Sequence, residues 1–108
     1  MATLEIERLK AMLDEANVPY VADYRLSSYM GNDGCQIIIN NKNNERLCDA
    51  IQFYGSHGYE NNLIEIMGGL TEEEEQEDTT LGWLSAEEVF KRFKYCYEHN
   101  TKYYVRED

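Results

Sequence analysis

The stretch GSHGYE at residues 55–60 contains the side chains most often used in hydrolytic chemistry. Ser56 and His57 are adjacent, two glycines flank this pair, and Tyr59 and Glu60 follow. A serine becomes a nucleophile only where a base meets it in space and a third group orients that base, and adjacency in sequence does not ensure this. The glycines are explained at least as well by turn conformation. Ser56 and His57 are therefore weak catalytic candidates for a hydrolase-like enzyme, and the balance favours a non-enzymatic protein.

Thiols and imidazoles form a second set of groups that could do chemistry, as metal ligands. Only Cys96 and His99 have useful spacing, three residues apart on one helical face, whereas a structural zinc site usually shows two such close pairs. The remaining members of the set are Cys35, Cys48 and His57. Cysteines in predicted strands are most often small buried apolar residues. Cys96 and His99 are thus weak metal candidates, and without a P-loop, dinucleotide fingerprint or HExxH motif we expect no cofactor.

Carboxylates are the most concentrated groups in the chain. The run LTEEEEQED at 70–78 has six acids in its last seven positions. In a helix they would lie about 2 Å apart along the axis, close to the spacing of about 1.7 Å per charge in duplex DNA. The predicted binding surface comprises Glu60, Glu65, Glu72, Glu73, Glu74, Glu75, Glu77, Asp78, Glu87 and Glu88. The alternatives are a solvated loop and, least favoured, a cation site, because an EF-hand loop alternates its ligands around a glycine.

The net charge of −11 is unevenly distributed. No lysine or arginine occurs between Arg46 and Lys91, and the eleven acids of that interval equal the whole net charge. The anionic part should attract basic proteins and repel nucleic acid and anionic membranes. The tyrosines could stack on bases, but no basic patch accompanies them, so we expect no direct binding of nucleic acid and no membrane partner.

Length and composition indicate one folded domain over residues 1–108. A hydrophobic fraction of 43%, with nine tyrosines, three phenylalanines and one tryptophan, is enough for a core. No apolar run reaches the length of a membrane span, and the start MATLEIERLK lacks the pattern of a signal peptide. Three cysteines without a CxxC pair fit reduced thiols. We therefore expect a cytoplasmic protein.

Two helices are predicted near the ends of the chain. Residues 4–16 form the first, because one face repeats apolar residues at three- and four-residue spacing, namely Ile6, Leu9, Met12, Leu13 and Ala16. Ser85 and Glu88 make a capping box for the second, and Leu84 with Val89 can form a hydrophobic staple. The apolar face of this helix contains Val89, Phe90, Phe93, Cys96 and Tyr97. Residues 101–108 follow as a tail that can fray.

Extended segments are predicted between the helices. Residues 20–30, 35–39 and 46–54 are separated by the turn sequences GNDG and NNKNN, which indicates an antiparallel meander. Asp49 shares a face with apolar neighbours, so it should lie at an edge or be hydrogen-bonded. LIEIMGGL at 63–70 is ambiguous between a short helix and a fourth strand, and its brevity and paired glycines favour the strand.

The predicted fold is α+β: an N-terminal helix, a three- or four-stranded antiparallel meander and a C-terminal helix, with both helices on one sheet face. The other face should be polar or paired with a partner. Thr71 and Glu74 have the spacing of a capping box, but Glu75 stands where the last helix has Val89, so no staple anchors the turn. Residues 71–80 are accordingly predicted to be an acidic loop or a short helical turn.

Residues 54–93 carry the features Ser56-x-Gly58, LIEIMG from Leu63, the Leu70-Thr71 acidic run and Gly82-Trp83-Leu84 before the final helix. This stretch resembles small uncharacterised acidic proteins of phages, prophages and other mobile elements of Gram-positive bacteria. The resemblance implies a protein of the bacterial host cytosol and brings no activity or catalytic residue. The order of elements is also similar to some anti-CRISPR and anti-restriction proteins, by architecture alone.

The leading hypothesis is a non-enzymatic acidic protein that binds a basic, nucleic-acid-handling partner as a nucleic-acid mimic or inhibitor. One rival is a small metal-binding protein or hydrolase-like enzyme that uses His57, or Cys96 with His99. Another is a structural or homo-oligomeric subunit that pairs its open sheet face. Whether the carboxylates form a binding surface depends on whether the fold holds them in fixed positions.

Overall fold

The computed structural model describes residues 3–24 and 34–106, and the predicted GNDG turn lies almost wholly outside them. The described residues form two long helices and five strands, with a 3₁₀ turn and a short helix between the later strands. In chain order the elements are α1 Glu5–Glu15, β1 Val21–Asp23, β2 Cys35–Asn40, β3 Arg46–Gln52, the 3₁₀ turn Tyr59–Asn61, β4 Ile64–Met67, α3 Glu72–Glu77, β5 Thr80–Leu84 and α4 Ala86–His99.

The strands form one antiparallel sheet in the order β1-β2-β3-β4-β5, so each strand pairs with its neighbours in sequence. The predicted α+β class and antiparallel meander are confirmed, and the segment at 63–70 does contain a strand, β4. The predicted count of three or four strands is too low, because β5 adds a fifth. β5 pairs with β4 through Ile66 opposite Leu81 and Ile64 opposite Leu84.

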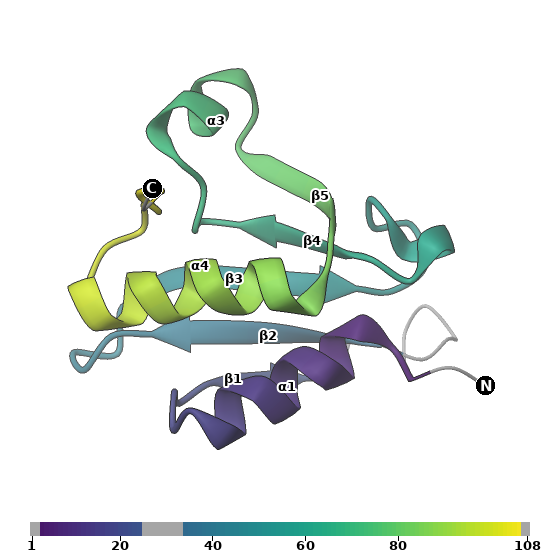
Figure 1. Cartoon of the computed structure of the whole chain (residues 1–108), viewed down its shortest axis with the longest axis horizontal. Helices are drawn as coiled ribbons and strands as arrows, with labels where there is room; N and C mark the ends of the chain where they lie inside the picture. Colours follow the sequence, from purple (N-terminus) through teal and green to yellow (C-terminus); the bar gives the residue numbers. More distant parts are fainter. Residues whose placement is uncertain (1–2, 25–33, 107–108) are drawn as a thin grey trace.

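Both long helices cover the same face of the sheet (Figure 1). Alternation along the strands places Ile37, Ala50 and Ile66 side by side on that face, and each is at most 1% exposed. The helices bury apolar residues at three- and four-residue spacing against them: Ile6, Leu9 and Leu13 from α1, and Val89, Phe93 and Cys96 from α4. The periodicity of the sequence therefore reports the buried faces correctly.

The start of α1 is held by side chains from elsewhere in the fold. Leu4 occupies its N-cap position and makes no side-chain cap. Instead the fully buried Gln52 accepts a hydrogen bond from the amide of Ile6 at 2.8 Å, and Asn62 accepts one from the amide of Glu5 at 3.0 Å. Gln52 also donates to Asn62 at 2.7 Å. These bonds satisfy amides that a helix leaves without partners in its first turn.

Asp49 on β3 faces away from the helices and accepts a hydrogen bond from Gln36 at 2.9 Å. This agrees with one of the two environments expected for it.

After β4 the chain turns through Gly68 at φ 76° and Gly69 at φ 72°. A β-carbon at Gly68 would lie 2.6 Å from the carbonyl oxygen of Leu47, so only glycine fits this crossing.

The C-terminal segment pairs with the connection between β4 and α3. The amide of Gly69 donates to the carbonyl of Lys102, and the amide of Tyr104 donates to the carbonyl of Leu70, both at 2.8 Å. Tyr104 is only 5% exposed. Of the tail expected to fray, residues 101–106 thus lie against the fold, and residues 107–108 are outside the described part.

In residues 3–24 and 34–106, no helix combines the length and the apolar character needed to cross a membrane.

Replacing Gln52 with methionine should destabilise the fold, since the substitution keeps the size of the side chain but removes the acceptor for the Ile6 amide. We expect the free energy of unfolding to fall by about 2 kcal/mol, measured by urea denaturation. Gln76→Met on the exposed side of α3 is the matched control and should change it by less than about 0.5 kcal/mol. Equal effects of the two substitutions would contradict the capping role of Gln52.

Candidate functional site

The acidic run forms the helix α3, which begins at a complete capping box. Thr71 is the N-cap, and its hydroxyl accepts a hydrogen bond from the amide of Glu74 at 3.1 Å. The carboxylate of Glu74 accepts one from the amide of Thr71 at 2.8 Å. No residue of α3 is buried, so apolar contacts do not anchor it. The short helical turn expected from the sequence is present, and its attachment requires another explanation.

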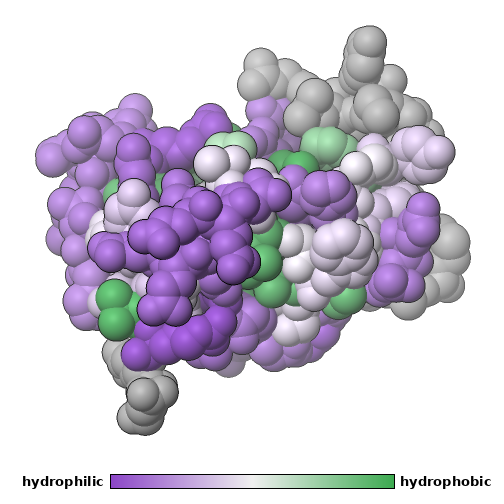
Figure 2. All heavy atoms as spheres, turned by 90° about the horizontal axis from the view of Figure 1, so that it is seen from above, coloured by the Kyte–Doolittle hydropathy of each residue, from purple (hydrophilic) through white to green (hydrophobic). Residues whose placement is uncertain are grey.

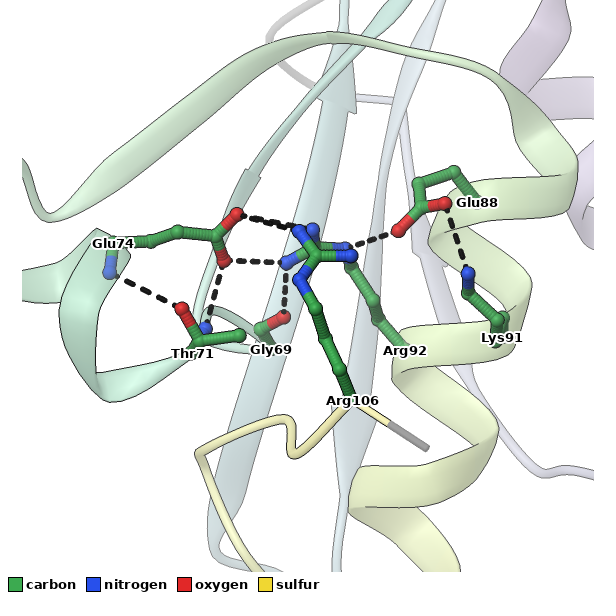
Figure 3. A network of polar contacts seen from close by, with 7 residues as sticks. All are labelled: Gly69, Thr71, Glu74, Glu88, Lys91, Arg92 and Arg106. Atoms are coloured by element: carbon green, nitrogen blue, oxygen red, sulfur yellow. Dashed lines mark hydrogen bonds and ion pairs between the residues drawn. The ribbon is translucent and has the colours of Figure 1, made fainter. Parts of the chain in front are cut away.

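Arg92 of α4 provides that attachment. Its side chain is 2% exposed, and its Nη1 and Nη2 donate to the two carboxylate oxygens of Glu74 at 2.8 and 3.1 Å (Figure 3). Its Nε donates to Glu88 at 2.7 Å, and Nη1 also donates to the carbonyl of Gly69 at 3.0 Å. Bidentate pairing fixes both the distance and the orientation of the two groups. The first turn of α3 is therefore fastened to α4 by an ion pair.

The electrostatics of this cluster favour its charged form. The guanidinium of Arg92 lowers the pKa of Glu74 to about 2, and the hydrogen bond from the Thr71 amide adds to this against the opposing effect of burial. Burial lowers the pKa of Arg92, but the bonds to Glu74 and Glu88 outweigh it and the net shift is upward. Both partners remain ionised at neutral pH, so the contact persists as a salt bridge.

The C-terminal segment encloses the cluster. The ring centroid of Tyr104 lies 5.1 Å from Cζ of Arg92, within the range of a cation–π contact. Arg106 adds a longer contact of 3.3 Å to Glu74. Tyr104 thus shields Arg92 from water. It is held there by the pairing of residues 101–106 with the β4–α3 connection.

The remaining carboxylates of α3 and its C-cap form what we term the acidic surface: Glu72, Glu73, Glu75, Glu77 and Asp78. Glu75 is half-buried and the others are exposed. Within the part of the chain that the structure describes, none of the five has an ion-pair partner, although Asp78 accepts a hydrogen bond from the amide of Thr80 at 3.2 Å. Seen from the α3 side, the molecule is predominantly hydrophilic (Figure 2). The acidic surface is therefore held in place through the neighbouring Glu74, and four of its five carboxylates face solvent.

The other acids of the predicted binding surface lie apart from it. Glu65 on β4 accepts a hydrogen bond from the amide of His57 at 2.6 Å. Glu87 is paired with Arg8 of α1, and Glu88 is used by Arg92 and by Lys91 at 3.1 Å. Glu60 is exposed in the 3₁₀ turn, at the other end of β5 from α3 (Figure 1). The ten acids therefore do not converge on one surface.

Ser56 and His57 have separate partners. The hydroxyl of Ser56 donates to the carbonyl of Phe53 at 2.8 Å and accepts from the amide of Phe53 at 3.2 Å, which closes a turn. The ring of His57 stacks on Trp83, with centroids 5.4 Å apart and planes 3° apart, and its Nδ1 lies 3.4 Å from Glu65. Among the described contacts, no hydrogen bond joins the serine to the imidazole. This arrangement shows no activated nucleophile.

Cys96 and His99 point to different environments. Cys96 is buried in the core, where it contacts Cys48, and Cys35 is also a buried free thiol. Burial raises the pKa of the Cys48 thiol well above its ordinary value. His99 is exposed and stacks on Tyr95, with ring centroids 4.0 Å apart. In the described residues, no three side chains of histidine, cysteine, aspartate or glutamate gather as metal ligands.

Comparison of the chain with protein-family models, with curated proteins and with solved structures finds no match. The resemblance of residues 54–93 to proteins of phages and mobile elements stays an expectation. The patterns in the sequence assigned no role to Arg92. Its spacing of four from Glu88 was a usable signal. Its contact with Glu74, 18 positions away, has no local signal.

Replacing Glu74 with glutamine should lower the free energy of unfolding by about 3 kcal/mol, because it leaves a buried guanidinium with one carboxylate partner fewer. Glu73→Gln is the matched control, since it removes the same charge from an exposed position of the same helix and should have little effect. Urea denaturation at neutral pH measures both. If the free energy of unfolding falls as much in the Glu73 variant as in the Glu74 variant, the charge of the helix and not the ion pair stabilises α3.

The same pair should give the fold an acid-sensitive contribution. Folding lowers the pKa of Glu74 from 4.5 to about 2, so folding favours the ionised carboxylate. The stabilisation is complete above pH 4.5 and is lost as the pH falls from there through about 2. We expect the difference in free energy of unfolding between the wild type and Glu74→Gln to shrink over this interval. A difference that stays constant down to about pH 3 would contradict the assignment.

Proposed function

We propose that this chain is a non-enzymatic protein that binds a basic protein partner through the acidic surface. The observation that carries the proposal is the bidentate ion pair between Glu74 and Arg92, because it fixes the helix that bears the exposed acids. Carboxylates on a fixed helix can pair with lysines and arginines at a smaller loss of conformational entropy than carboxylates on a mobile loop. The contacts of Glu74 thus support recognition over simple solvation.

The spacing of the acids supports a partner that handles nucleic acid. Consecutive residues of a helix rise about 1.5 Å along its axis, close to the spacing of about 1.7 Å per charge in duplex DNA. A protein whose lysines and arginines match phosphates therefore meets a similar charge density on α3. The net charge of −11 adds long-range attraction for such a partner. We propose that the chain acts as a mimic or inhibitor in the bacterial cytosol, in line with the resemblance to mobile-element proteins.

A second candidate is a structural subunit that pairs with a copy of itself through the open face of the sheet. Val21 and Met67 lie on the face opposite the helices, in one row with Ile38 and Asp49. Val21 is 50% exposed and Met67 is 51% exposed. Exposed apolar residues on a sheet face are a common feature of subunit interfaces. The molecular mass in solution distinguishes this candidate from a monomeric binding protein.

Binding to a basic probe should weaken with salt and with loss of the exposed acids. A peptide of about nine lysines serves as the probe, and calorimetry measures its affinity at about 50 and about 300 mM NaCl. We expect the variant Glu72→Gln/Glu73→Gln/Glu77→Gln to bind about tenfold more weakly than the wild type at the lower salt concentration.

The control for this experiment is Glu15→Gln/Glu45→Gln, which removes exposed acids that lie outside the interval between Arg46 and Lys91. It should bind nearly as well as the wild type. Circular dichroism establishes that all variants are folded. Affinity that is insensitive to both salt and the α3 substitutions, or that falls equally in the control, would overturn the proposed function.

A further inference from the structure

Aromatic side chains line a hollow of about 320 Å³ at the C-terminal end of β5, remote from α3. We term it the aromatic hollow, and its principal residues are Tyr54, His57, Tyr59, Glu60 and Trp83. Tyr54 and Tyr59 meet edge to face, with centroids 6.3 Å apart. Trp83 is the sole tryptophan of the chain, and it is 59% exposed. Large aromatic residues are usually buried, so their exposure here needs a reason.

A β-bulge turns Trp83 toward the hollow. Ile64 pairs with Leu84 and Ile66 with Leu81, so two residues of β5, Gly82 and Trp83, stand opposite the single residue Glu65. Trp83 takes a left-handed conformation with φ 56°, which is strained for a bulky side chain. Bulges re-aim side chains at the edges of sheets, often next to functional sites. The fold therefore accepts backbone strain in order to hold this ring at the surface.

Two glycines fix the position of the ring by close backbone approach. A β-carbon at Gly82 would lie 2.4 Å from the β-carbon of His57, and one at Gly58 would lie 2.9 Å from the amide nitrogen of Trp83. That amide donates to the carbonyl of His57 at 3.3 Å. The parallel stacking of His57 on Trp83 follows from this contact between the loop and β5. The close backbone contacts at Gly58 and Gly82 thus fix the shape of this side of the hollow.

The electrostatics of the hollow favour a cation. Glu60 is exposed at its edge, and Glu65 lies next to His57. No lysine or arginine occurs from residue 47 to residue 90, the interval that contains all the principal residues of the hollow. Aromatic faces attract cations, and a planar guanidinium also stacks on them. A phosphate-bearing ligand would be repelled by the two carboxylates.

We propose that the aromatic hollow receives an arginine side chain of the basic partner, stacked against Trp83 and paired with Glu60. This inference rests on the proposed function, because the partner is the one that the acidic surface binds. β5 joins the two sites, and the five residue-to-residue steps from Asp78 to Trp83 span about 16 Å in extended form. One basic protein can therefore contact both, with lysines or arginines on α3 and one arginine in the hollow.

The sole tryptophan provides the test. Peptides of about nine arginines and about nine lysines carry equal charge, so the acidic surface attracts both equally at long range. Bidentate pairing of guanidinium groups with exposed carboxylates adds its own preference for arginine, and Trp83→Gly measures that part separately from the hollow. We expect the arginine peptide to bind about fivefold more tightly and to change the fluorescence of Trp83, which the lysine peptide leaves nearly unchanged. N-acetyl-arginine amide at millimolar concentration should produce a similar change, reduced in Glu60→Gln.

Two substitutions separate the ring from the fold. Trp83→Gly relieves the strain at φ 56°, so this variant should remain folded while losing the part of the preference for arginine over lysine that the ring supplies. Trp83→Phe keeps an aromatic face and should retain most of that preference. Calorimetry measures both affinities, since neither variant has a tryptophan to report binding.

The outcomes distinguish this inference from the proposed function. Equal binding of the two peptides with unchanged Trp83 fluorescence overturns the arginine site, and the acidic surface still stands if Glu72→Gln/Glu73→Gln/Glu77→Gln weakens both. Failure of both peptides to bind overturns the proposed function. In that case the guanidinium site is still supported if N-acetyl-arginine amide changes the fluorescence of Trp83 and Glu60→Gln reduces this change. If neither peptide binds and N-acetyl-arginine amide leaves the fluorescence of Trp83 unchanged, both the proposed function and the arginine site are overturned.

Discussion

A buried guanidinium that requires carboxylate partners is the constraint on which this structure depends. Arg92 is 2% exposed, and leaving such a charge without a partner costs several kcal/mol. Glu88 supplies one partner from the same helix, and Glu74 supplies the other from α3. Because Glu74 also completes the capping box with Thr71, one carboxylate both begins α3 and attaches it to the core.

The structure divides the acids of this chain between two uses. Some are bound within the molecule: Glu5 accepts a hydrogen bond from the first amide of α4 at 2.7 Å, and Glu87 pairs with Arg8 of α1. Others, such as Glu72 and Glu73, are held at the surface by the anchor beside them. Pairing of Glu5 and Glu87 with Arg8 lowers the like-charge repulsion where the two long helices meet.

Periodicity in the sequence predicted the helices and most of the sheet, because apolar spacing records which face of an element is buried. β5 was missed for a physical reason. Its bulge at Gly82 and Trp83 interrupts the alternation of side chains, and the strand gains its place only by pairing with β4. Cys96 and His99 show the same limit, because a spacing of three suggested a shared face whereas one side chain is buried and the other is exposed.

The sequence by itself determined the fold class, the helix start at Ser85, the capping-box spacing of Thr71 and Glu74, and the concentration of acids between Arg46 and Lys91. These are local properties, governed by side-chain spacing and capping within a few residues. Only the tertiary structure decided which acids are anchored and which are exposed, and that Trp83 meets His57 in a hollow. The physical reason is that ion pairs and ring contacts depend on distances in space, and residues 18 or more positions apart come together only when the sheet and helices pack.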